Sequence, residues 1–124
     1  MLSREEFEDI AQEILDGLPQ QFCENLENVQ ISVEDVPTPE TLAKMGLTSP
    51  ASLYGLYEGV PLTKRGTWYG MYPVVPDKIS LYKNNIERGA RTPGELKARI
   101  RHVLIHEIAH YYGMTEQEVR AAGY

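Results

Sequence analysis

The chain has 124 residues, 42% of them hydrophobic, which predicts one compact domain over residues 1–124 with a single modest core. Residues 1–6 lack the basic start of a signal peptide, no segment approaches the length of a membrane span, and the single cysteine cannot form an internal disulfide. These features predict a cytoplasmic protein that binds no membrane. The net charge of −6 and a pI near 5.0 argue against a nucleic-acid partner.

The first elements in chain order are predicted to be scaffold. Ser3 and Glu6 form a capping-box pair, and a helix follows up to Gly17. Its apolar positions recur at helical spacing: Phe7, Ile10, Ala11, Ile14 and Leu15. Pro19 opens a shorter helical stretch, and residues 29–33 alternate between apolar and polar side chains, as a half-buried strand does. Apart from surface carboxylates, which are expected to be solvated, these elements lack the residue types that hydrolytic chemistry needs.

Glycines and prolines punctuate residues 46–76, which predicts strands separated by turns and loops. Strand-like pieces lie at residues 53–57 and 68–72, and a further strand is predicted at residues 79–82. The aromatic side chains in this part of the chain could line a substrate cleft. Packing against a small sheet is the commoner role for such side chains.

A long helix is predicted over residues 93–112, after a start signal at Thr92 and Pro93. Its apolar residues recur with a 3.6-residue period on one side: Leu96, Ile100, Val103, Leu104, Ile108 and Tyr111. His106 and His110 lie at the margin of that side. Packing of the helix on the core would therefore hold the two imidazoles in place and leave one side open to a substrate.

The pentapeptide His106-Glu107-Ile108-Ala109-His110 in this helix matches the HExxH pattern of zinc sites. Positions i and i+4 lie on one face of a helix, so both imidazoles can reach one metal ion. A Zn²⁺ ion held by His106, His110 and one further ligand keeps a position open for water and lowers the pKa of that water toward about 7. Glu107 is predicted to take the proton of that water as general base.

The third ligand is expected close to the motif, because only 14 residues follow His110 and leave no room for a distant glutamate. The pattern continues to HExxHxxGxxE, in which Gly113 can end the helix in a left-handed turn. Glu116 then stands at the third-ligand position, and Glu118 also lies within reach. Thr115 and Glu118 form a capping-box pattern, which gives Glu118 a structural role and favours Glu116 as the metal ligand.

His102 completes an i, i+4, i+8 series with His106 and His110. Residues eight apart on a straight helix are separated by about 12 Å along its axis, too far for both to bind one ion. We therefore expect His102 to be a surface residue or to support a ligand.

Charge is unevenly distributed along the sequence. Residues 1–40 contain eleven acidic residues and one basic residue, whereas residues 41–124 contain eleven basic and seven acidic residues. Lys97, Arg99 and Arg101 lie near the motif. They could attract an acidic or carboxylate-bearing substrate, or they could face the acidic N-terminal helices or solvate one face of the long helix.

These features together resemble the minimal zincin-like metallopeptidases, small single-domain bacterial proteins built around HExxHxxGxx followed by an acidic residue. The likeness includes residues 33–37, 53–59, 76–82 and 106–114. It implies an α+β, zincin-like fold in which N-terminal helices and a small mixed sheet pack on the helix with the HExxH motif. It also implies zinc at His106, His110 and Glu116 and a general base at Glu107, but no particular substrate.

The leading hypothesis is a zinc-dependent metallopeptidase that hydrolyses a peptide bond in a peptide or protein substrate. An alternative is a non-catalytic zinc-binding module with a regulatory or interaction role. The intact Glu107 argues against that alternative, because a structural zinc site needs no general base and usually fills its fourth position with protein. A metal-dependent ribonuclease is disfavoured by the acidity of the chain and by the lack of a third histidine after the motif.

Overall fold

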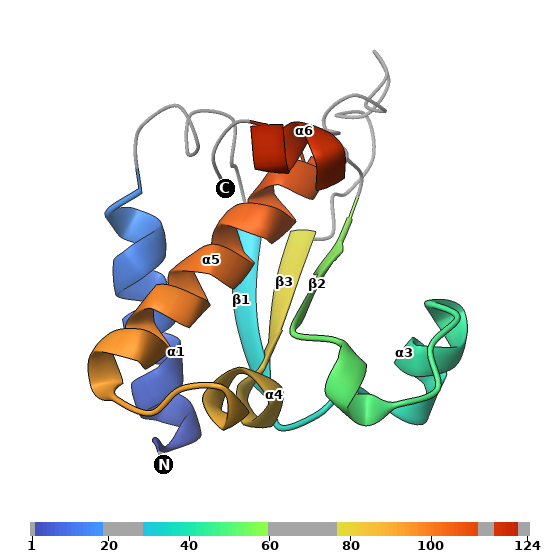
Figure 1. The fold of residues 1–124 in the computed structure, drawn as a ribbon, viewed down its shortest axis with the longest axis horizontal. Helices are drawn as coiled ribbons and strands as arrows, with labels where there is room; N and C mark the ends of the chain where they lie inside the picture. Colours follow the sequence, from blue (N-terminus) through green and yellow to red (C-terminus); the bar gives the residue numbers. More distant parts are fainter. Residues whose placement is uncertain (1, 19–28, 60–76, 112–115, 122–124) are drawn as a thin grey trace.

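The structure is a computed structural model that describes residues 2–18, 29–59, 77–111 and 116–121. Its centre is a three-stranded mixed sheet of β1 (Val29–Glu34), β2 (Gly55–Glu58) and β3 (Asp77–Tyr82), in the order β1-β3-β2. β1 runs parallel to β3 and β2 runs antiparallel to it. The predicted α+β class with a small mixed sheet is thus confirmed, and β2 lies at one edge of the described sheet (Figure 1).

Helix α1 (Arg4–Asp16) begins at the predicted capping box. The Ser3 hydroxyl accepts a hydrogen bond from the backbone N–H of Glu6, at 3.1 Å, and the Glu6 carboxylate accepts one from the N–H of Ser3, at 3.2 Å. The bond from the Ser3 backbone lowers the pKa of Glu6, because it favours the charged carboxylate. The helix buries Phe7 and Ala11 completely against the sheet side of the molecule.

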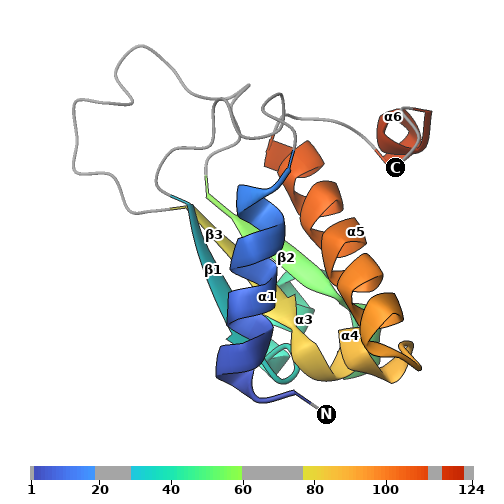
Figure 2. The ribbon, with the colours of Figure 1, turned by 90° about the vertical axis from the view of Figure 1, so that its left-hand side faces the viewer.

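Helices α1 and α5 (Pro93–Tyr111) lie side by side on one face of the sheet (Figure 2). Alternate strand residues point into this layer, and the register sets Val33 opposite Leu81 and Tyr57 opposite Ile79. The core between the layers consists of buried apolar side chains from both helices and from the strands: Phe7, Ala11, Val33, Ile79, Leu81, Leu96, Ile100, Leu104 and Ile108. Burial of this face fixes the position of α5 on the sheet.

The predicted start of α5 is confirmed. The Thr92 hydroxyl accepts a hydrogen bond from the N–H of Glu95, at 3.1 Å, which caps the helix. Leu96, Ile100, Leu104 and Ile108 are buried as predicted from the 3.6-residue period, and Val103 is half-buried. The side chain of Tyr111 lies outside the described residues, and α6 (Glu116–Ala121) follows after a gap.

Three short elements were not predicted from the sequence: α3 (Pro39–Lys44), the 3₁₀ turn η1 (Pro50–Ser52) and α4 (Lys83–Arg88). Each is too short to show a full hydrophobic period. The start of α3 was nevertheless readable, because Thr38 caps it and Pro39 follows at the first helical position. The helical stretch expected from Pro19 and the strand-like piece at residues 68–72 lie outside the described residues.

Asn85 of α4 fixes the segment that leads into β2. Its Nδ2 atom donates hydrogen bonds to the carbonyl oxygens of Pro50 and Leu53, both at 2.7 Å, and the residue is only 2% exposed. The backbone N–H of Tyr82 then donates to the carbonyl oxygen of Tyr54, at 3.0 Å. These bonds hold the approach to β2 against β3 and α4.

Tyr82 of β3 is buried on the opposite side of the sheet from Ile79 and Leu81, because side chains alternate along a strand. Burial, followed by the negative charges of Glu34 and Glu58, raises the pKa of Tyr82 to about 12.

No helix in the described stretches has both the length and the apolar composition needed to span a membrane.

Candidate metal centre

The motif residues lie near the C-terminal end of α5, within little more than one helical turn. His106 is half-buried, His110 has a side chain that is 42% exposed, and Glu107 is only 8% exposed. The two histidines therefore lie at the margin of the buried face, as predicted. Glu107 points from the same helix toward β2, where it is held by the backbone of that strand.

The carboxylate of Glu107 is positioned by a hydrogen bond to the sheet. Its Oε1 atom accepts a hydrogen bond from the backbone N–H of Tyr57, at 2.8 Å, and lies 3.8 Å from Nδ1 of His110. A carboxylate held by a backbone N–H cannot turn away without leaving that half-buried donor without this partner. Glu107 is therefore fixed beside the pair of imidazoles.

Gly55 permits the close approach of β2 to α5 that this hydrogen bond needs. A Cβ atom at residue 55 would lie 2.7 Å from Cγ1 of Val103 and 3.4 Å from Cγ of Glu107. The sequence contained a signal for this contact, because a glycine within a strand often marks the close approach of another backbone or helix. The residue that it serves, Glu107, could be identified only from the tertiary structure.

A second set of contacts holds the C-terminal end of β2 against the first residue of β3. The hydroxyl group of Tyr57 donates a hydrogen bond to the carboxylate of Asp77, the first residue of β3, and Asp77 is only 4% exposed. Gly59, with φ of +154°, packs against the same carboxylate so closely that a Cβ atom there would overlap it. The backbone N–H of Tyr57 is thus aimed at Glu107 by a side chain anchored on the neighbouring strand.

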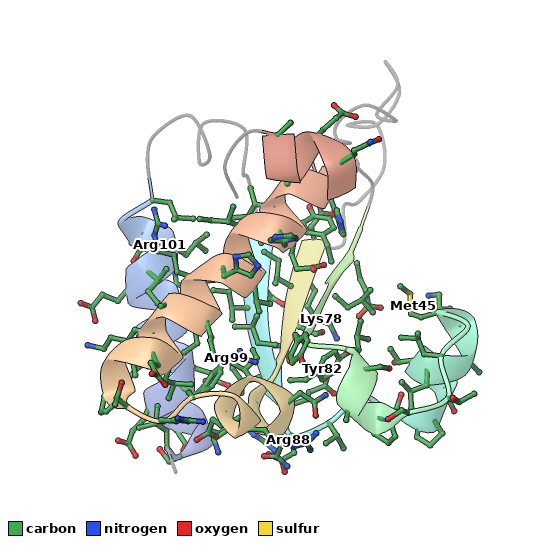
Figure 3. The ribbon with its side chains drawn as sticks, in the orientation of Figure 1. Met45, Lys78, Tyr82, Arg88, Arg99 and Arg101 are labelled. Atoms are coloured by element: carbon green, nitrogen blue, oxygen red, sulfur yellow. The ribbon has the colours of Figure 1, made fainter. Side chains whose placement is uncertain are left out.

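A cavity of about 330 Å³ opens beside these residues. It is lined by all three histidines and Glu107 from α5 and by residues of β2 and the segments before it: Met45, Ser52, Leu53, Tyr54, Gly55, Leu56, His102, Val103, His106, Glu107 and His110. Met45, which follows α3 and is labelled in Figure 3, lines this cavity from the side opposite α5. The cavity has the size of a small-molecule or side-chain pocket.

His102 lies in the position expected of a surface or supporting residue. It is exposed, and its ring centroid lies 4.3 Å from that of His106, with the two ring planes inclined by 50°. The imidazole of His102 therefore packs on that of His106 and restricts its orientation.

The predicted third ligand falls at the limit of what the structure describes. Helix α6 begins at Glu116, as the capping pattern of Thr115 predicted, but the side chain of Glu116 and the backbone of Gly113 lie outside the described residues. Glu118 is exposed on α6. Among the described side chains, no three His, Cys, Asp or Glu residues form a group that could hold a metal ion.

The residues that are described fit zinc in their chemistry. Two imidazoles at i and i+4 on one helix face line the same cavity, which is the paired nitrogen donor set of zinc sites. A carboxylate that is not needed for binding the metal lies next to them and is held by the sheet. The set is complete for zinc if one local carboxylate supplies the third ligand.

The basic residues near the motif divide into two groups. Lys97 and Arg101 are exposed and line neither of the two described cavities next to the histidines, which agrees with the interpretation that they solvate the helix. Arg99 is half-buried and lines a cavity next to that of the histidines. The charge pattern of the sequence could not separate these roles.

The sequence model of the zincin-like metallopeptidase family matches residues 26–124. The chain belongs to this family. The match covers the sheet, the HExxH helix and α6, so the resemblance noted from the sequence is confirmed for most of the chain. No curated protein matches the sequence.

Among solved structures, the zincin-like chain is similar to a conserved hypothetical protein from Thermus thermophilus. The TM-score is 0.56 at 19% sequence identity, over 90% of this chain and 94% of the other. At this identity the likeness concerns the fold alone. It shows that the arrangement of helices and sheet recurs in a second protein over nearly the whole of both chains.

Proposed function

We propose that the protein is a zinc-dependent peptidase in which His106, His110 and Glu116 hold the metal and Glu107 is the general base. The observation that carries the proposal is the placement of Glu107, buried and hydrogen-bonded to β2 within the cavity that both motif histidines line. A structural zinc site has no use for a carboxylate fixed in this way. Membership of the zincin-like metallopeptidase family supports the same reaction class.

The residues of the chain divide the work of hydrolysis among them. When bound, zinc would polarise the scissile carbonyl and lower the pKa of a water molecule in the site toward about 7. Glu107 would accept the proton of that water and donate it to the leaving amine, and its hydrogen bond to Tyr57 holds one oxygen in place meanwhile. His102 would orient the His106 imidazole by ring contact.

The edge of β2 next to the cavity would hold the substrate. The carbonyl of Tyr54 accepts a hydrogen bond from β3, so the peptide groups of Gly55 and Tyr57 point away from β3, as alternate residues of a strand do. The N–H of Tyr57 is already taken by Glu107, so the substrate would pair with the peptide group of Gly55. An extended peptide can add to such an edge through backbone hydrogen bonds, next to the cavity of the histidines.

A reducing cytoplasm remains the location that the single cysteine predicts.

Metal analysis of purified variants tests the ligand set. His106→Ala, His110→Ala and Glu116→Gln are expected to lose stoichiometric zinc, whereas Glu118→Gln, the matched control, is expected to retain it. Full zinc in His106→Ala would refute the site. Loss of zinc in Glu118→Gln but not in Glu116→Gln would move the third ligand to Glu118.

Cleavage of a broad peptide library tests the reaction. Glu107→Gln keeps an oxygen that can accept the hydrogen bond from Tyr57 but has no basic carboxylate, so it should bind zinc normally and lose about 10²–10⁴-fold in cleavage rate. Cleavage by the wild type that does not depend on zinc or on Glu107 would contradict the proposal. A zinc-loaded wild type that cleaves nothing in the library would favour the non-catalytic zinc-binding module.

A further inference from the structure

Arg99 lines a second cavity that adjoins the cavity of the histidines. This cavity has a volume of about 440 Å³ and is lined by Tyr54, Ala98, Arg99, His102 and Val103. Three of these residues, Tyr54, His102 and Val103, also line the first cavity. The two spaces therefore form one groove along α5, with the HExxH residues at one end and a cationic side chain at the other.

The guanidinium group of Arg99 is held in a fixed position between α5 and α4, as Figure 3 shows for the labelled residue. Its Nε–H donates a hydrogen bond to the carbonyl oxygen of Ile86, at 2.8 Å. Its Cζ atom lies 5.5 Å from the ring centroid of Tyr54, in cation–π contact. Gly89 leaves room for it, since a Cβ atom there would lie 2.5 Å from Cζ. This cation is therefore already ordered before any ligand binds.

The outer nitrogen atoms of Arg99 have donors to spare. An arginine carries five N–H donors, and the bond to Ile86 uses only the one on Nε. Within the described part of the chain, no carboxylate forms an ion pair with Arg99 and no acceptor is hydrogen-bonded to its Nη atoms. The acidic residue nearest in sequence on the exposed side, Glu95, instead accepts a hydrogen bond from the backbone N–H of Arg91. The planar guanidinium group of arginine can donate two parallel hydrogen bonds to the two oxygen atoms of a carboxylate.

The spacing along α5 sets how far such a carboxylate would lie from the metal ligands. Arg99 and His106 are seven residues apart, which brings them to nearly the same side of the helix and separates them by about 10 Å along its axis. An extended peptide rises about 3.3 Å per residue, so this distance corresponds to about three residues.

The direction of β2 decides which end of a peptide would reach Arg99. The strand begins beside Tyr54, which contacts Arg99, and continues to Tyr57, which contacts Glu107. A peptide added antiparallel to β2, the slightly more stable pairing, runs the other way. Its C-terminal side would then lie at the Arg99 end of the groove.

We propose that Arg99 binds a carboxylate of the peptide substrate, two to three residues on the C-terminal side of the scissile bond. The inference rests on the proposed peptidase function and narrows its substrates to peptides with a free C-terminal carboxylate, or an acidic side chain, at that distance. It also gives Arg99 a role that Lys97 and Arg101, on the same helix, do not have.

The test uses short thiol probes bound to the full-length protein loaded with Co²⁺ in place of zinc. A thiolate bound to Co²⁺ gives a charge-transfer absorption band, so binding is read without turnover. Two probes are mercaptoacetyl-dialanine as the free acid and as its C-terminal carboxamide. The other two are mercaptoacetyl-alanyl-aspartic acid with its C-terminus amidated and the same compound with asparagine in place of aspartic acid. We expect the free acid to bind about tenfold more tightly than the carboxamide, the advantage typical of a charge-assisted hydrogen bond.

Arg99→Gln should reduce the ratio of acid to carboxamide affinity to near one, Arg99→Lys should reduce it in part, and Arg101→Gln, the matched control, should leave it unchanged. The ratio is measured within each variant, so partial loss of folded protein affects both probes equally. A preference for the aspartic acid probe over its asparagine analogue would assign the carboxylate to a side chain, and a preference confined to the free acid would assign it to the C-terminus.

The possible failures are distinguishable. Equal affinity of the wild type for all four probes, or an unchanged ratio in Arg99→Gln, would overturn the carboxylate site and leave the peptidase proposal standing. Wild-type protein that takes up no Co²⁺ would refute the metal centre, and this inference with it.

Discussion

Replacing Gly55 with alanine would force β2 and α5 apart at the candidate metal centre. The new Cβ atom would lie 2.7 Å from Cγ1 of Val103, whereas an ordinary contact begins at 3.4 Å, so with the Val103 rotamer unchanged the two elements separate by about 0.7 Å. The same shift added to the 2.8 Å bond between Tyr57 and Glu107 gives about 3.5 Å, where a hydrogen bond is largely lost. The substitution should therefore weaken both the fold and the hold on the general base.

The expected cost combines two opposing effects. Overpacking costs about 1–3 kcal/mol, and alanine recovers about 0.4–1 kcal/mol by restricting the unfolded chain. We expect a net loss of about 1–2 kcal/mol in the free energy of unfolding, or roughly 5 °C in Tm for a domain of this size. Urea and thermal unfolding of the metal-free protein measure it. Gly94→Ala is the matched control, because the nearest atom to its Cβ is 3.9 Å away.

A double-mutant cycle with Val103→Ala tests the stated cause. Removing Cγ1 of Val103 deletes the closest contact, so Gly55→Ala should be less destabilising in that background, with a coupling of about 1 kcal/mol. Rescue should be partial, because the carbonyl oxygen of Ser80 still lies 3.2 Å from the new Cβ atom. Strict additivity of the two substitutions, or a Gly55→Ala protein as stable as Gly94→Ala, would contradict the close approach.

Three further predictions concern hydrogen bonds and titration. Tyr57→Phe removes the hydroxyl group that donates to the buried Asp77 and should lower the unfolding free energy by about 1–2 kcal/mol. The control Tyr54→Phe, at an exposed tyrosine, should lower it little. Equal effects of the two substitutions would contradict the anchoring role of Tyr57. Because the pKa of Tyr82 is raised to about 12 in the folded state, its contribution to the unfolding free energy should be constant below pH 10 and fall as pH rises from 10 toward 12, and Tyr82→Phe should lack this alkaline slope. Burial alone would raise the pKa of Glu87, but hydrogen bonds from Lys83 and the N–H of Leu2 lower it overall. The contribution of Glu87 to the unfolding free energy should therefore be present above pH 4.5 and lost as pH falls below it. Urea unfolding of Glu87→Gln should show a weaker acid dependence than that of the wild type.

Long periodic elements were predictable because their signals are local. The capping box at Ser3 and the 3.6-residue apolar period placed α1 and α5, alternation placed β1, and a further strand was predicted at residues 79–82, within β3. The short α3 and α4 were missed, since six residues give less than two helical turns of pattern. The HExxH motif, in turn, predicted His106, Glu107 and His110 as candidates because positions i and i+4 lie on one helix face, and the structure places all three at one cavity.

The sequence by itself determined the α+β class and which helix and which residues are candidates for a metal centre, because helical spacing brings i and i+4 side chains together without help from the rest of the chain. Only the tertiary structure decided what surrounds them. It brought the backbone N–H of Tyr57 to Glu107 across fifty residues of sequence and separated Arg99, which lines the groove, from Lys97 and Arg101, which face solvent. Such contacts depend on how closely a strand and a helix approach, and a linear pattern of residue types does not encode that distance.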